Sequence, residues 1–225
     1  MKLYKFLLLS WLMLAPGIIN AQSSLLSGKV DTQDDMNMTQ SFDSSLYEYY
    51  PVTDDNMLWA DDKTKYTKVQ LKKKHLELQC KEQGMFVSAV SKVPVDFKAN
   101  IVVNGIFAPW VINDKHKFGF IFNARNELNF HAIVFGNKYA YYITAEKGQI
   151  SVEERALYKI SKNKAWNVAF VKEGSKCTVM LDGMEIMELN NLELDGNKVG
   201  FYTDNKSVLY AYGVGYFQQP EEEEN

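Results

Sequence analysis

The chain has 225 residues, of which 46% are hydrophobic and 24% are charged, and its formal net charge is −3. A nucleic-acid-binding domain usually carries a strongly basic face, so this balance argues against nucleic acid as a partner. The two cysteines, Cys80 and Cys177, lie far apart and lack the spacing of a metal site. We expect buried free thiols and keep a disulfide as the alternative.

The first 21 residues have the pattern of a secretory signal. Lys2 and Lys5 provide a basic start, an apolar run follows from Phe6 to Leu14, and Ala21 offers a small residue for cleavage. The run is shorter than the roughly 20 apolar residues of a membrane-spanning helix. No cysteine lies near the cut to accept a lipid. We therefore expect an exported, periplasmic or extracellular protein that does not span the membrane.

Composition divides the rest of the chain into three parts. Residues 22–40 are rich in polar side chains without periodicity, which predicts a flexible lead-in. Residues 41–218 have the length of one β-sandwich domain. Residues 219–225 include four consecutive glutamates and predict a solvated acidic tail.

Residues 41–218 read as many short strands separated by turn residues. Asp182-Gly183 between two alternating runs is a strong hairpin signal, because such turns need positive φ. Close spacing of strands predicts an all-β sandwich or barrel. Beyond an opening region around Phe42 and Trp59, the expected strands are 68–71, 75–80, 85–90, 95–103, 117–123, 128–135, 139–144, 149–152, 166–172, 176–181, 185–189, 198–202 and 207–217.

Three segments carry a family resemblance. Phe118-Gly119-Phe120 to Arg125 leads into Asn129-Phe130-His131, Trp166-Asn167 opens a strand that pairs with one ending in Asp182-Gly183, and a late strand reads Lys198-Val199-Gly200-Phe201-Tyr202. In this order the domain resembles the concanavalin A-like lectin and glucanase superfamily. More narrowly, it is similar to exported laminin-G-like and 3-keto-disaccharide hydrolase-like domains of Bacteroidetes.

The resemblance implies a jelly roll of two antiparallel sheets and a carbohydrate-related role. Two features depart from the family pattern: His131 stands where tyrosine is usual, and the segment from Asn104 to His116 is expected to be a long apolar loop.

No catalytic motif is evident. Glucanases of this fold carry Glu-x-Asp-x-x-Glu on one strand, which places two carboxylates on one face. That motif is missing, and the nearest piece, Glu193-Leu194-Asp195, runs into the turn Gly196-Asn197. Carboxylates from different strands can still meet, so a glycoside-directed hydrolase stays as the alternative to a non-catalytic binding module.

Metal binding has little support in the sequence. His75, His116 and His131 are scattered and form no ligand pair, so no metal site is predicted. Calcium stays possible through the acidic pairs Asp54-Asp55 and Asp61-Asp62, which are more simply solvated turn residues.

Four residues are the predicted ligand contacts. Trp110 is a large ring inside the expected long loop, where exposure needs a reason. Strand alternation groups His131 and Tyr142 on faces poorer in apolar residues, and we expect them with Arg125 near the rim of an open concave face. Trp166 heads a strand and is expected in the core.

The sequence therefore predicts an exported, non-catalytic module that binds a glycan or another envelope component. A hydrolase and a structural or adhesion module without a small ligand are the alternatives.

Overall fold

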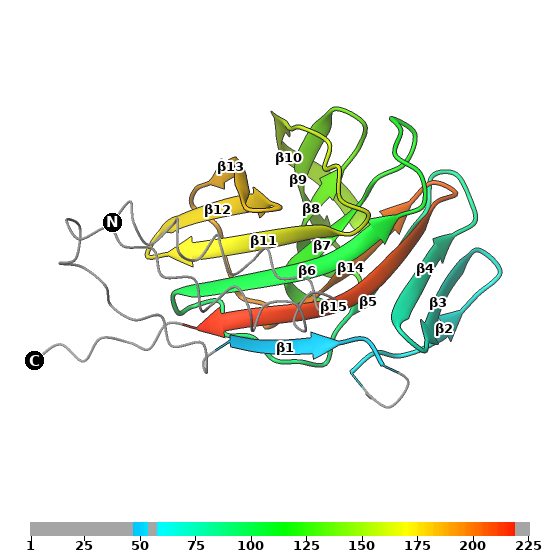
Figure 1. Ribbon diagram of the computed structural model, residues 1–225, viewed down its shortest axis with the longest axis horizontal. Helices are drawn as coiled ribbons and strands as arrows, with labels where there is room; N and C mark the ends of the chain where they lie inside the picture. Colours follow the sequence, from blue (N-terminus) through cyan, green and yellow to red (C-terminus); the bar gives the residue numbers. More distant parts are fainter. Residues whose placement is uncertain (1–46, 54–57, 219–225) are drawn as a thin grey trace, which may run out of the picture.

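The computed structural model describes residues 47–53 and 58–218 (Figure 1). The expected signal segment, lead-in and acidic tail, together with Phe42, Asp54 and Asp55, lie outside these residues. The described part of the chain consists of strands, turns and bends without a helix. It forms two antiparallel sheets packed face to face, so the prediction of an all-β sandwich is confirmed.

The larger sheet, sheet A, has the order β13-β12-β11-β6-β15-β4-β3-β2, and β1 also pairs with β15. The long central strand β15 pairs with β4 at its start and with β1 at its end, around a bulge between Ala211 and Gly213. Its strands are β1 (Tyr47–Pro51), β2 (Asp62–Lys63), β3 (Thr67–Lys72), β4 (His75–Cys80), β6 (Ile101–Pro109), β11 (Trp166–Glu173), β12 (Lys176–Leu181), β13 (Met184–Leu189) and β15 (Val208–Gln218).

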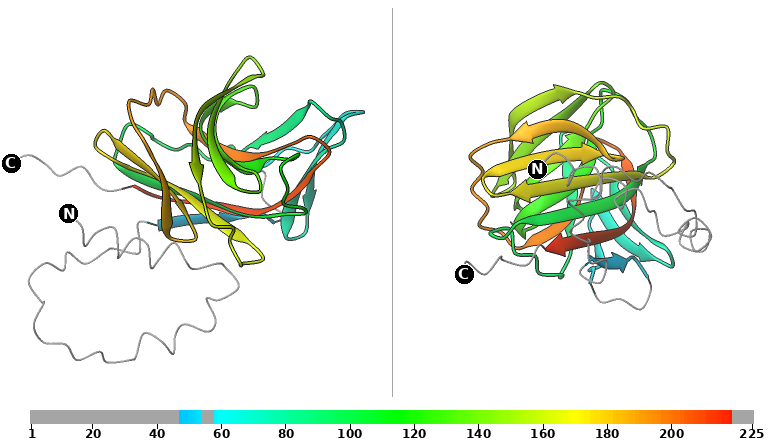
Figure 2. Two further views of the ribbon diagram at one scale, coloured as in Figure 1. Left: turned by 90° about the horizontal axis from the view of Figure 1, so that it is seen from above. Right: turned by 60° about the vertical axis from the view of Figure 1, so that its left-hand side comes forward.

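The smaller sheet, sheet B, has the order β10-β9-β8-β7-β14-β5 and curves strongly (Figure 2). Tight hairpins join β7 to β8, β8 to β9 and β9 to β10, and Lys147 and Gly148 both take the positive φ that such a turn needs. Its strands are β5 (Phe86–Val90), β7 (Phe118–Asn126), β8 (Asn129–Phe135), β9 (Tyr139–Glu146), β10 (Gln149–Leu157) and β14 (Lys198–Asp204).

The prediction of a loop from Asn104 to His116 is wrong for its first half. Residues 104–109 continue β6, and the expected start of that strand, residues 95–100, forms bends instead. The run Ile101–Phe107 is buried throughout, because β6 lies in the middle of sheet A. A strand buried on both faces loses the alternation by which strands are recognised in a sequence. β1 and β2 were not predicted individually.

The space between the sheets is filled with aromatic rings. Phe122 of sheet B stacks on Phe170 of sheet A with centroids 4.3 Å apart. Phe120 lies against Gly105 of sheet A, where a Cβ atom would come within 2.3 Å of its ring. Trp166 contacts Phe118 and Phe135 and is 1% exposed, which confirms its expected core position. A second apolar cluster covers the other face of sheet B.

Both cysteines are buried free thiols, as preferred from the sequence. The Sγ–H of Cys80 donates to the backbone oxygen of Met85 at 3.2 Å. Burial raises the pKa of the Cys177 thiol.

Replacing Trp166 with alanine should lower the free energy of unfolding by about 3–5 kcal/mol, because it empties a fully packed ring site. Chemical denaturation followed by circular dichroism measures the change. Trp110→Ala is the matched control, since that ring is exposed and surface changes usually stay within about 0.5 kcal/mol. Equal loss of stability in the two variants would contradict the core assignment.

Candidate functional site

Two of the four predicted ligand residues are in direct contact on sheet B. His131 lies on β8 and Tyr142 on β9, and the Tyr142 hydroxyl shares a hydrogen bond with Nδ1 of His131 at 2.9 Å. Arg125 lies near the end of the neighbouring strand β7. We call Arg125, His131 and Tyr142, together with the carboxylates described below, the polar cluster.

The prediction that places His131 and Tyr142 near the rim of an open face is wrong. Both rings lie on the face of sheet B that meets sheet A, beside Phe122 of β7, with ring centroids 5.9 and 6.2 Å from it. The alternation along β8 is as predicted, with Phe130 and its apolar neighbours on the opposite face. Both faces of this strand are buried over most of its length, so apolar content does not reveal which one meets the second sheet.

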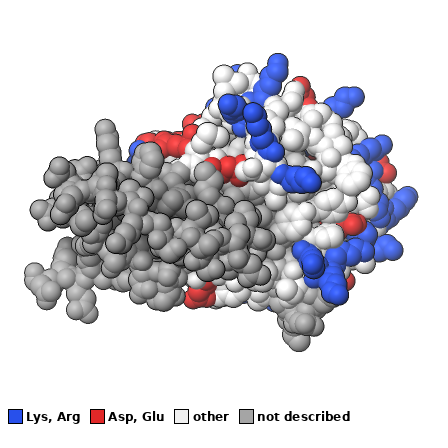
Figure 3. Space-filling model, viewed as in Figure 1, with Lys and Arg blue, Asp and Glu red and all other residues white. Residues whose placement is uncertain are grey.

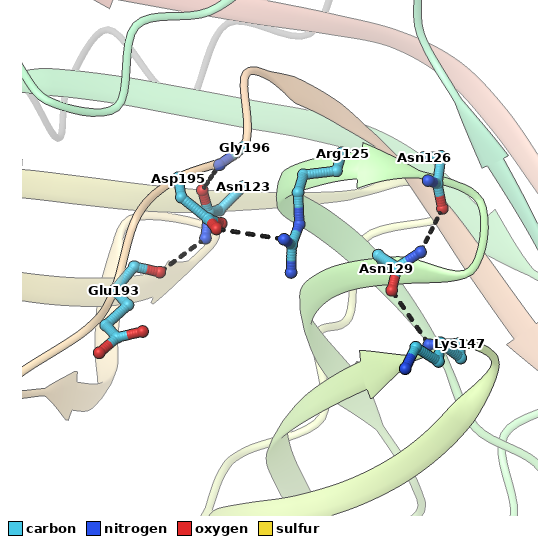
Figure 4. Close-up of polar contacts among 8 residues, drawn as sticks. All are labelled: Asn123, Arg125, Asn126, Asn129, Lys147, Glu193, Asp195 and Gly196. Atoms are coloured by element: carbon cyan, nitrogen blue, oxygen red, sulfur yellow. Dashed lines mark hydrogen bonds and ion pairs between the residues drawn. The ribbon is translucent and has the colours of Figure 1, made fainter.

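A bulge in β7 brings an acidic loop to the polar cluster (Figure 4). Asn123 takes φ 50° there, a conformation that asparagine tolerates better than most residues. Its side chain accepts a hydrogen bond from the Gly196 amide at 2.6 Å and donates to the Glu193 carbonyl at 2.9 Å. These bonds fix the loop so that Asp195 forms an ion pair with Arg125 at 3.4 Å.

The same end of sheet B is braced by asparagines in its turns (Figure 4). The side chain of Asn129 donates to that of Asn126 at 2.8 Å and accepts from the Lys147 amide at 3.0 Å. These two bonds tie the β7–β8 turn to the β9–β10 turn. The polar cluster therefore rests on a rigid hairpin end.

Burial dominates the electrostatics of the polar cluster. It lowers the pKa of His131, while Asp195, Glu153 and Glu193 act in the opposite direction and Arg125 reinforces the lowering. Burial also raises the pKa of Tyr142, with Glu153 adding to the effect. Glu153 itself accepts a hydrogen bond from Thr144 at 2.8 Å.

The polar cluster offers both hydrogen-bond donors and acceptors to a ligand. The sequence prediction missed Asn123, Glu153, Glu193 and Asp195. Glu193-Leu194-Asp195 drew attention only as an incomplete catalytic motif, and the sequence could not show that its loop returns to β7.

Trp110 lies in a different place, on the outer face of sheet A. It directly follows β6, its amide donates to Val208 at 3.0 Å, and its side chain is 68% exposed. Its ring meets the Tyr210 ring edge-on, with the ring centroids 6.0 Å apart. The His75 ring lies with its centroid 5.0 Å from that of Tyr210 and 6.3 Å from that of Tyr212. We call Trp110, Tyr210, His75 and Tyr212 the aromatic strip.

Charged groups border the aromatic strip. Lys68 and Glu77 form an ion pair at 2.7 Å beside it. Burial raises the pKa of Tyr210, Glu77 adds to the shift, and Lys68 opposes it. Lys73 and Lys74 in the adjoining turn are exposed. Basic side chains gather along the right-hand border of Figure 3, on the side where β2 to β4 lie.

Within residues 47–53 and 58–218, no three His, Cys, Asp or Glu side chains gather as a metal site would require. Asp61, one of the calcium candidates, accepts a hydrogen bond from the Leu71 amide at 2.6 Å. The described residues also contain no helix of the length and apolarity needed to cross a membrane.

Comparison with known proteins identifies the fold. No family model and no curated protein matches this sequence. Among solved structures, the Emp47p carbohydrate recognition domain matches with a TM-score of 0.55 at 11% identity, over 79% of this chain and 99% of its own. A Bacillus licheniformis beta-glucanase matches with 0.54 at 11% identity, over 79% and 100%.

A third similar structure, the carbohydrate binding module CBM66 from Bacillus subtilis, has a TM-score of 0.50 at 13% identity, over 72% of this chain and 91% of its own. Identities this low establish architecture alone. The chain therefore has the concanavalin A-like lectin and glucanase fold.

The electrostatics of His131 predict how stability depends on pH. Below the ordinary histidine pKa of about 6.5, the unfolded chain binds a proton that folded His131 does not. Stability should therefore fall as the pH decreases from about 6.5 toward the lowered folded pKa, and His131→Gln should remove that part of the fall. An NMR titration, assigned with the same variant, should give a midpoint for His131 below 6.5. A midpoint at or above this value would contradict the burial argument.

Proposed function

We propose that the mature protein is an exported module that binds a glycan, or another component of the cell envelope, at the aromatic strip. The observation that carries this proposal is the exposure of Trp110, at 68%, beside further rings on the surface of a sheet. An aromatic face covers the C–H face of a sugar ring, while neighbouring polar groups bond the hydroxyls.

The backbone around the strip is held in place before any ligand arrives. Tyr210 and Tyr212 belong to the central strand β15, His75 begins β4, and the Trp110 amide is bonded to Val208. Binding then orders few groups, which lowers its entropic cost. The Lys68–Glu77 pair supplies a donor and an acceptor beside the rings.

The similar structures support a carbohydrate ligand, because they are a carbohydrate binding module, a carbohydrate recognition domain and a beta-glucanase. They do not distinguish binding from hydrolysis. We favour binding because Glu77, the acidic side chain beside the aromatic strip, is paired with Lys68. The narrower likeness to exported laminin-G-like or 3-keto-disaccharide hydrolase-like domains is part of this proposal.

A glycoside hydrolase acting at the polar cluster is the second candidate. It is favoured by the electrostatics of His131: burial lowers its pKa, and the charges of Asp195, Glu153 and Glu193 oppose that shift. Glycosidases use paired carboxylates. Incubating glycans with the mature protein and measuring new reducing ends tests this candidate. Activity that disappears in Asp195→Asn would establish hydrolysis, and its absence on every glycan bound would favour the binding module.

Export of the protein rests on the basic start, the apolar run and Ala21. N-terminal sequencing of the protein recovered from the periplasm or the medium should begin at or near Gln22. A mature protein that retains Met1 would contradict export through a cleaved signal.

Replacing Trp110 with alanine should weaken binding of the glycans that the wild-type protein captures on an array by roughly thirtyfold. Loss of an aromatic anchor typically costs about 2 kcal/mol or more. Calorimetry with one captured glycan measures the change, and Arg125→Ala is the control because Arg125 belongs to the polar cluster. Normal binding by Trp110→Ala together with loss in Arg125→Ala would move the site to the polar cluster. Capture of no glycan would favour the structural or adhesion module.

A further inference from the structure

Most edge strands of the two sheets carry features that discourage pairing with another chain. β2 has only two residues, both charged, while β10 carries Glu153, Glu154 and Arg155. β13 carries two glutamates, and β1 has Glu48 and Pro51. Charge, proline and short length are the usual protection of an exposed edge. The edge strand β5 differs, because its sequence Phe-Val-Ser-Ala-Val contains neither a charged residue nor a proline.

The backbone of β5 presents a regular set of groups on its outer edge. The Ser91 amide donates to Val199 at 2.8 Å, and the Asn205 amide donates to Met85 at 3.0 Å. In this antiparallel register, residues 85, 87, 89 and 91 bond to β14. The N–H and C=O groups of Phe86, Ser88 and Val90 therefore point away from β14. Within the described ranges, no backbone or side-chain partner is found for them.

A groove of about 860 Å³ runs along this edge. β5 and the residues before it, from Gly84, form its floor. One wall comes from Ala60, β2 and β3, including Asp62, and the other from the turns of the two hairpins of sheet B. The Ser88 hydroxyl donates to the Glu127 carbonyl at 2.7 Å and so fastens the second wall to the floor.

We propose that this groove binds an extended segment of a partner polypeptide, which adds to sheet B as a strand beside β5. Three outward amides and carbonyls on alternate residues match the hydrogen-bonding groups of one extended chain. Walls on both sides admit a single strand, whereas the recessed β5 of a second copy cannot reach the floor. The floor is apolar, with Phe86, Val87, Ala89 and Val90 among its residues.

The charge of the groove indicates which side chains the bound segment carries. Its lining contains two carboxylates, Asp62 and Glu127, and no lysine or arginine. The preferred segment therefore has apolar side chains at alternate positions and at least one basic side chain that reaches a carboxylate on a wall of the groove. This site is separate from the glycan-binding surface proposed above and does not depend on it.

The test uses the mature protein and a phage-displayed library of random ten-residue peptides. The most enriched sequence is synthesised unmodified and with N-methyl groups on alternate backbone amides, which removes its donors along each edge in turn. Ser88→Pro deletes an outward N–H without touching the bonds to β14, since an edge strand tolerates proline there. Ser88→Ala is the matched reference, because both variants lose the hydroxyl bond to Glu127 and only the proline variant also loses the N–H.

We expect enrichment of alternating apolar peptides that carry a basic residue. Ser88→Pro should bind about tenfold more weakly than Ser88→Ala, as the loss of one hydrogen bond implies. One of the two N-methylated peptides should fail to bind. Glu127→Lys, which leaves the backbone intact, should also weaken binding if the proline variant does not fold.

Three results would overturn the proposal. They are the absence of enrichment, equal binding of both N-methylated peptides, and dimerisation through β5 in place of peptide binding. Equal binding by Glu127→Lys and the wild-type protein would refute the preference for a basic residue.

Discussion

The packing of phenylalanine rings between the two sheets determines how the sheets face each other and where the two candidate sites lie. Phe120 occupies the space that Gly105 leaves on sheet A, and Phe122 stacks on Phe170 at 4.3 Å. These contacts bury apolar area from both sheets at once, which is the main source of stability in a sandwich. They also fix the distance between the sheets and decide which side chains of each strand face the core.

Both candidate sites follow from that constraint. His131 and Tyr142 lie on the inward face of sheet B but at its end, where they pack on Phe122 and still meet the charges of the Asp195 loop. In β15, Leu209 and Ala211 face the core, so Tyr210 and its neighbour Tyr212 emerge on the outer face of sheet A. The aromatic strip therefore includes outward-facing residues of β15, the strand whose inward-facing residues belong to the core.

The sequence predicted the elements that depend on local chemistry. Asp182-Gly183 and Lys147-Gly148 adopt positive φ in hairpin turns, and Trp166 lies in the core at the head of its strand. It did not predict the extent of β6, whose buried run lacks alternation, or which face of β8 meets sheet A. The Arg125–Asp195 pair depends on contacts between segments 70 residues apart, such as Asn123 with Glu193. Local sequence patterns carry no information about contacts between such distant segments.

The most direct test of a glycan-binding surface on sheet A is a nuclear magnetic resonance titration of the mature protein with a glycan captured on an array. The indole N–H resonance of Trp110 should shift first, together with the amides of His75, Tyr210 and Tyr212. Shifts confined to Arg125, His131 and Asp195 would contradict this site and place the ligand at the polar cluster.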